Sequence, residues 1–119
     1  MEDQAYLDAV QAQRAIITAK RTRRGELASA ERNGITISGI RLAAADRDRS
    51  MFAQMLVMLR EAEDLLPDES AKTAFRASQQ TIADAQGGTH TMTVTEVRAL
   101  LVAYGAAYQA LWTAAAQPS

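Results

Sequence analysis

The chain has 119 residues, no cysteine, a single histidine and a formal net charge of −1. One domain is the natural expectation for this length, and the lack of cysteine excludes a disulfide framework and thiol chemistry. The near-neutral charge gives no overall reason to expect nucleic acid as a partner. The acidic start, MEDQAYLDAV, lacks the basic-then-apolar pattern of a signal peptide, so we expect synthesis and folding in a cytoplasm.

The first predicted element is one long helix over about residues 2–33, which holds no proline and one glycine. Its apolar stripe is thin, and a strict heptad fails between Ile17 and Leu27. Thin-striped helices are marginal in isolation, so this one should lie on its own domain or on neighbouring subunits. A bundle or coiled-coil stem is an alternative. We divide the chain into this N-terminal helix, residues 1–34, and a small α+β domain, residues 35–117.

A cluster of four basic residues lies in this helix, formed by Lys20, Arg21, Arg23 and Arg24. One interpretation is a site for phosphate or an acidic partner. The other, which we favour, is a solvated helix face that pairs with neighbouring acidic residues. No aromatic residue interleaves with the basic ones, as a single-stranded nucleic-acid site would require.

A β-hairpin is predicted after Asn33-Gly34, where the glycine can end the helix. Apolar and polar residues alternate over residues 35–42 on both sides of Ser38-Gly39, which favours two short strands and a two-residue turn. The apolar side of this hairpin needs a helix to cover it.

A second helix begins at Asp46 or Asp48 and runs to about residue 66, before Pro67. The helical period predicts a core stripe of Met51, Met55, Met58, Leu59, Ala62 and Leu66, broadened by Phe52, Leu56 and Leu65. The three methionines could instead line an adaptable binding groove. The acidic residues Glu61, Glu63 and Asp64 are interpreted as a solvated helix end.

After a turn at residues 67–70, residues 71–78 form a short helix or an irregular connection. A second hairpin follows, with strands at residues 81–83 and 89–93 around a Gly-Gly loop. His90 is interpreted as a strand histidine, because a lone histidine without cysteine cannot make a familiar zinc site. The predicted fold class is α+β: a long N-terminal helix, and two hairpins that form one small antiparallel sheet with two further main helices packed on it.

The last helix starts with Thr93 and Glu96, which have the spacing of a capping box. Its aromatic row of Tyr104, Tyr108 and Trp112 is interpreted as core or subunit contact, with a stacking platform for sugars or bases as the alternative. Gly105 suggests close approach of another backbone. We expect no membrane span, because polar residues and glycine dilute the uncharged stretch 99–116 and its length is only about the minimum. Pro118 would suit the chain leaving this helix.

The layout resembles an uncharacterised domain that recurs in bacteriophage tail-fibre and tail-assembly proteins. The resemblance covers about residues 15–115 and is carried by short structural motifs. They are the basic helix ending in Arg32-Asn33-Gly34, the stretch ITISGIRLAAADRDRS with the Met/Leu helix after it, residues 82–87, and residues 92–98. In such domains the second hairpin often opens with a tryptophan, and residues 78–81 contain none.

The resemblance implies a non-enzymatic tail component, an adaptor or fibre-associated protein made in the host cytoplasm and placed in the virion. Its expected partners are other tail proteins and further copies of itself. The resemblance supplies no catalytic residues, and the sequence itself offers no catalytic, cofactor or metal constellation. Two alternatives remain: a fibre-assembly chaperone that is absent from the virion, and a nucleic-acid-binding regulator that uses residues 20–24.

Overall fold

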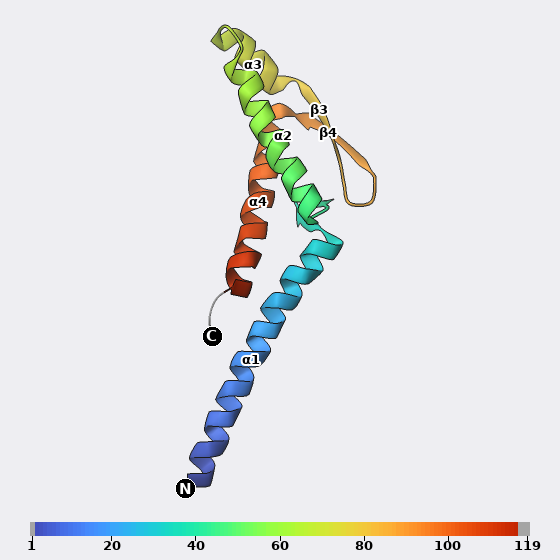
Figure 1. The fold of residues 1–119 in the computed structure, drawn as a ribbon. Coiled ribbons are helices and arrows are strands. Elements are labelled where there is room, and N and C mark those ends of the chain that lie inside the picture. The colour runs from blue at the N-terminus through green and yellow to red at the C-terminus, as the bar shows by residue number, and fades with distance from the viewer. Residues whose placement is uncertain (1, 117–119) are drawn as a thin grey trace.

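The computed structural model describes residues 2–116, and residue 1 and residues 117–119 are not described (Figure 1). The elements in chain order are α1 (Glu2–Asn33), β1 (Ile35–Ile37), β2 (Ile40–Leu42), α2 (Asp46–Asp64), α3 (Glu69–Ala77), β3 (Gln79–Ala83), β4 (Thr89–Thr93) and α4 (Val94–Ala116). The predicted α+β class and the long N-terminal helix are confirmed. The expectation for Pro118 falls outside the described residues.

The molecule is strongly elongated, because α1 extends well beyond the other elements (Figure 1). Its extents are 76 × 29 × 22 Å and its radius of gyration is 20.9 Å. A compact chain of this length has a radius of gyration of about 13.5 Å. The accessible surface is 8125 Å², against roughly 6,300 Å² for a compact monomer of the same mass. The excess of roughly 1,800 Å² shows how much surface this shape leaves without intramolecular cover.

Helix α4 is the centre of the fold, since it contacts the other three helices and both hairpins. Its buried side chains face the hairpins on one side and α2 on the other. The rings of Phe52 on α2 and Tyr104 on α4 meet edge to face, with centroids 5.1 Å apart. The buried core consists of Ile35, Leu42, Ala44, Phe52, Leu59, Ile82, Val94, Val97, Leu100, Leu101 and Tyr104.

The first hairpin forms as predicted, and two backbone features explain it. Gly34 has φ +95°, and a Cβ at this position would lie 2.6 Å from the carbonyl oxygen of Leu42. Its N–H donates to the carbonyl of Ala30 and so ends α1. Ser38 and Gly39 both have positive φ, which is the requirement of a type I′ turn.

The second hairpin pairs β3 and β4 in antiparallel register, with Ile82 opposite His90 and buried against α4. The prediction of one joined sheet was wrong, because the structure has two separate sheets of two strands each. The loop of the second hairpin, rather than the edge of a strand, reaches the first hairpin. A backbone hydrogen bond of 2.8 Å links them there, from the N–H of Ala85 to the carbonyl of Arg41.

The capping box of α4 is confirmed. The backbone N–H of Glu96 donates to the hydroxyl of Thr93 at 3.2 Å, and the Glu96 carboxylate accepts from the Thr93 N–H at 3.1 Å. The region expected as a short helix or irregular connection is helix α3, which Asp68 caps by accepting from the N–H of Ala71. Both helices therefore begin with a side-chain cap.

Candidate interaction surfaces

The first unpartnered surface is the free part of α1, residues 3–20, which we call the stem. Every side chain from Asp3 to Ala19 is exposed except Val10, which is half-buried. Tyr6 is 70% exposed and Leu7 51%. Figure 1 shows the stem projecting away from the domain, beyond the C-terminal end of α4. Its apolar residues therefore have no cover within the chain.

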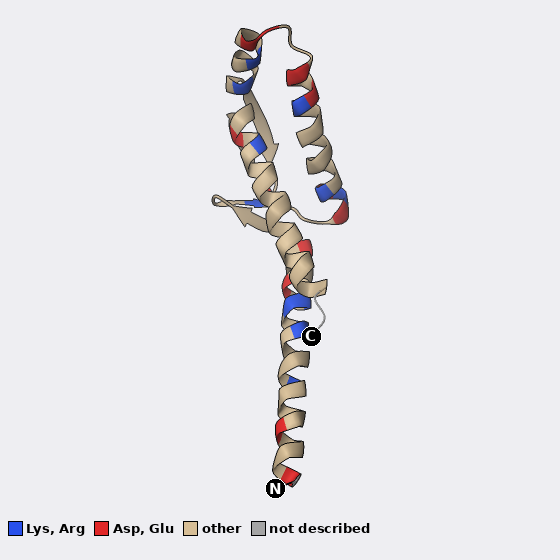
Figure 2. Cartoon of the chain, turned by 90° about the vertical axis from the view of Figure 1, so that its left-hand side faces the viewer, with Lys and Arg blue, Asp and Glu red and all other residues tan. Residues whose placement is uncertain are grey.

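The basic cluster lies where the stem meets α4, as the blue segment near the end of α4 shows in Figure 2. Arg21 and Arg24 are exposed, whereas Lys20 and Arg23 are half-buried. The Nε of Arg23 is buried and has no hydrogen-bond partner among the described residues. The cluster is therefore split between two exposed and two half-buried cations and is not a fully solvated helix face.

The aromatic row on α4 separates into three environments. Tyr104 is 3% exposed and donates a hydrogen bond of 2.7 Å to the carbonyl of Ala43. Burial raises the pKa of Tyr104 to about 12. Tyr108 is half-buried and Trp112 is 51% exposed. Tyr104 is a core residue, as predicted, whereas Trp112 lies outside the core and its subunit contact stays a prediction. A buried ring cannot stack on a ligand, so the row is no stacking platform.

Tyr108 connects three helices. Its hydroxyl donates to a carboxylate oxygen of Glu31 on α1 at 3.0 Å, and the Arg49 guanidinium of α2 lies 3.9 Å from its ring centroid. Burial is the main cause that raises the pKa of Tyr108, and the hydrogen bond to Glu31 adds to it. Glu31 and Arg49 lie far from Tyr108 in the sequence, so local sequence patterns could not predict either contact.

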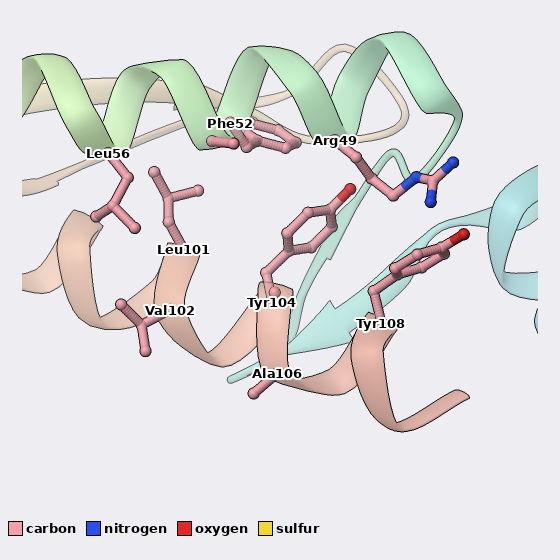
Figure 3. Close-up of a pocket in the computed structure, with 10 residues that line it drawn as sticks. Arg49, Phe52, Leu56, Leu101, Val102, Tyr104, Ala106 and Tyr108 are labelled. Atoms are coloured by element: carbon pink, nitrogen blue, oxygen red, sulfur yellow. The ribbon is translucent and has the colours of Figure 1, made fainter. Parts of the chain in front are cut away.

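The second unpartnered surface is the apolar outer side of α2 and α4, which we call the α2/α4 face. A groove of about 320 Å³ runs between the two helices near Arg49 and Tyr108. Figure 3 shows that Leu56, Leu101 and Tyr104 point into the space between the helices, whereas Val102 and Ala106 point outward. Val102 and Trp112 are its exposed large apolar side chains on α4, and Val57 and Met58 line a second hollow on α2 that shares Ala53 with the groove.

The core stripe predicted for α2 is confirmed at Leu59 and Met55 and wrong at Met51, Met58 and Ala62. Phe52 and Leu59 are buried, while Met51 and Met58 are 48% and 67% exposed. Each exposed methionine is one residue, or 100° of helix, away from a buried neighbour. Two stripes with the same period exist in this helix, and the packing of Phe52 on Tyr104 selects the one that faces α4. Leu65 is likewise exposed, beyond the end of the helix.

Gly105 does not mark close approach within the chain, because nothing lies within 4 Å of a Cβ built there. It is exposed on α4 beside Val102 and Ala106. The expected contact with another backbone is therefore wrong for the single chain. The glycine lines the groove of the α2/α4 face instead.

Glu63 is the centre of a charged network and is not part of a solvated helix end as predicted. Its side chain is 13% exposed and pairs with Arg76 of α3 and, at 3.3 Å, with Arg98 of α4. Arg98 also donates to the carbonyl of Leu59 at 2.8 Å. The hydrogen bond from Arg76 is the largest cause that lowers the pKa of Glu63. The network fastens α2, α3 and α4 together.

His90 is a strand residue, as predicted. Its Nε2 lies 2.9 Å from a carboxylate oxygen of Asp84 in the hairpin loop. Asp84 also accepts from the N–H groups of Gln86 and Gly88. The hydrogen bond with His90 is the main cause that lowers the pKa of Asp84. These contacts shape the loop.

Within residues 2–116, no group of three or more His, Cys, Asp or Glu residues is placed to hold a metal ion. Helix α4 is long and apolar enough to cross a membrane by length and composition alone. In this structure it packs against the rest of the domain. Comparison with protein-family models, curated proteins and solved structures finds no match to the chain.

Proposed function

We propose that this chain is a non-enzymatic component of a bacteriophage tail, an adaptor or fibre-associated protein that acts through protein–protein contacts. The resemblance of residues 15–115 to a domain of tail-fibre and tail-assembly proteins supplies the tail context. The observation that carries the adaptor role is the stem, an 18-residue helical segment whose apolar side chains have no cover within the chain.

In a monomer, the stem would leave its apolar side chains in water, which is unfavourable in free energy. An isolated helix of about 12–15 residues is marginal in water, and protein helices gain most of their stability from packing an apolar face. Tyr6, Leu7, Ile16 and Ile17 are all at least 45% exposed. Neighbouring molecules in an assembly would supply the missing cover.

The α2/α4 face gives the adaptor a second contact surface on the domain itself. Val102 is 58% exposed at the groove between the two helices, and Val57 is 52% exposed in the hollow on α2 that shares Ala53 with this groove. Large exposed apolar patches mark protein-interaction sites on soluble proteins. With the stem, it would let one chain contact two neighbours in different directions.

Quantitative mass spectrometry of purified phage or phage-like particles from the producing strain tests the proposal. We expect the chain in a fixed ratio to the major tail protein. A chain found only in the lysate and co-purifying with a fibre polypeptide would indicate the assembly chaperone instead. A chain absent from particles and bound to no tail protein would refute the proposal.

The regulator hypothesis is tested separately by a DNA mobility shift at low salt, with residues 20–24 intact and with the four basic residues replaced by alanine. The split burial of the cluster gives this hypothesis no support, because two of the four cations lie partly under cover. We expect no shift for either protein. A salt-sensitive shift that the alanine variant abolishes would favour the regulator.

A further inference from the structure

The stem carries a continuous seam along one side. Its members alternate at spacings of three and four residues, as the a and d positions of a coiled coil do. In order they are Asp3, Tyr6, Val10, Gln13, Ile17 and Lys20. Leu7 and Ile16 flank the seam and widen its apolar middle. The seam is about 26 Å long and ends where α1 meets α4.

The charges on the stem have opposite signs at its two ends. Asp3 and Asp8 lie in its first half, whereas Arg14 and Lys20 lie in its second, followed by exposed Arg21 on the same helix. Parallel pairing of two stems would set like charges side by side. Antiparallel pairing would set the acidic end of each stem against the basic end of the other.

We propose that two copies of this chain associate through antiparallel pairing of their stems. A register in which opposed residue numbers sum to 23 places Asp3 opposite Lys20, Tyr6 opposite Ile17, and Val10 opposite Gln13. Because the pairing has two-fold symmetry, each layer occurs twice. The register is set by the two ends of the seam, where Asp3 of each copy meets Lys20 of the other and the apolar layers of Tyr6 with Ile17 lie between them.

The stem offers exposed surface for a pair. Its side chains from Asp3 to Ala19 are exposed except Val10, and they contribute part of the roughly 1,800 Å² by which the whole chain exceeds a compact monomer of its mass. A standard interface covers about 800 Å² per partner. Among the described residues, Arg49 is the one charged residue that lines the groove of the α2/α4 face, whereas the stem carries charges of both signs at opposite ends, so the stem is the surface whose charges select a second copy. Pairing of the stems is compatible with any role that uses the stem and does not depend on a place in a phage tail.

Orientation is tested by disulfide formation, because the chain has no cysteine of its own. The variants Asp3→Cys and Lys20→Cys are oxidised separately and as an equimolar mixture. Antiparallel pairing predicts a cross-linked dimer only in the mixture, since Cys at position 3 faces position 20 of the second copy. Cross-linking of each variant with itself indicates parallel pairing and overturns the proposal, as does no cross-linking at all.

The role of the apolar seam is tested by sedimentation with a matched pair of variants. Ile17→Asp places a charge in the seam, and Ala15→Asp places the same charge on the opposite side of the same helix. We expect a wild-type dimer of twice 12.9 kDa, with a dissociation constant raised roughly tenfold or more by Ile17→Asp and little changed by Ala15→Asp. Thermal unfolding of the domain confirms that both variants remain folded.

Either of two outcomes would overturn the antiparallel pairing of the stems. Neither bears on the tail role, which is tested by the abundance of the chain in phage particles. One is a wild-type chain that is monomeric at every concentration tested. The other is an assembly that survives Ile17→Asp unchanged, which would assign self-association to a different surface such as the α2/α4 face.

Discussion

The three tyrosines of this chain allow one chemical change to be measured at three depths of burial. Replacing Tyr104 by Phe removes a hydroxyl that lies 2.7 Å from the carbonyl of Ala43 on a ring that is 3% exposed. A hydrogen bond of this kind contributes about 1 kcal/mol net, and loss of the partner leaves a half-covered carbonyl. We therefore expect Tyr104→Phe to lower the free energy of unfolding by about 1–2 kcal/mol.

The other two tyrosines are the controls. Tyr108→Phe removes a half-buried bond to Glu31, so we expect a loss of up to about 1 kcal/mol. Tyr6→Phe changes a hydroxyl on a ring that is 70% exposed, and we expect no measurable loss. Urea unfolding followed by Trp112 fluorescence measures all three. Equal midpoints for Tyr104→Phe and Tyr6→Phe would refute the placement of Tyr104 in the core.

The raised pKa of Tyr104 also determines how the free energy of unfolding should change at high pH. Burial raises the pKa of Tyr104 from its ordinary value of 10 to about 12. The unfolded chain therefore loses this proton first. The stabilising contribution is complete below about pH 10 and is lost as pH rises toward 12. Tyr104→Phe should flatten this part of the profile, and an unchanged slope would contradict the assignment.

Three further changes test the rest of the fold by urea unfolding. Glu63→Gln should lower the free energy of unfolding at pH 7 and flatten its dependence on pH on the acid side. The lowered pKa of Glu63 gives stability that is present above its ordinary 4.5 and lost as pH falls through the lowered value. A pH dependence parallel to that of the wild type would contradict this. Thr93→Ala should cost about 1 kcal/mol by removing the cap of α4, and no loss would dispute the cap. Gly34→Ala should cost about 1–3 kcal/mol through positive φ and contact with Leu42, and no loss would contradict this placement. Exposed Gly105→Ala should gain about 1 kcal/mol, and a loss there would contradict its open surroundings.

The sequence predicted those features that depend on neighbours in the chain. The capping box of Thr93 and Glu96, the turn at Ser38-Gly39 and the helix end at Gly34 each require only a few adjacent residues. Short-range sterics and hydrogen bonds determine such features, so local patterns are sufficient to place them.

The sequence could not predict features that depend on a partner far along the chain. Glu63 pairs with Arg98 of α4, and Tyr108 with Glu31 of α1, 77 residues away. Which side of α2 is buried depends on the stripe that meets α4. The helical period alone cannot decide whether Phe52 or Met51 is the buried residue. Whether two hairpins join into one sheet likewise depends on how α4 holds them.

The central position of α4 has a consequence for the order in which the chain folds during synthesis. The hairpins and α2 bury their apolar sides against a helix that comes last among the described elements, and the Tyr104 hydroxyl bonds to a carbonyl 61 residues earlier. Contacts of such long separation form late, and ribosomes add residues in sequence. The nascent chain must therefore hold residues 35–93 without a completed core until α4 has been synthesised. During that interval their apolar side chains are the ones available to chaperones.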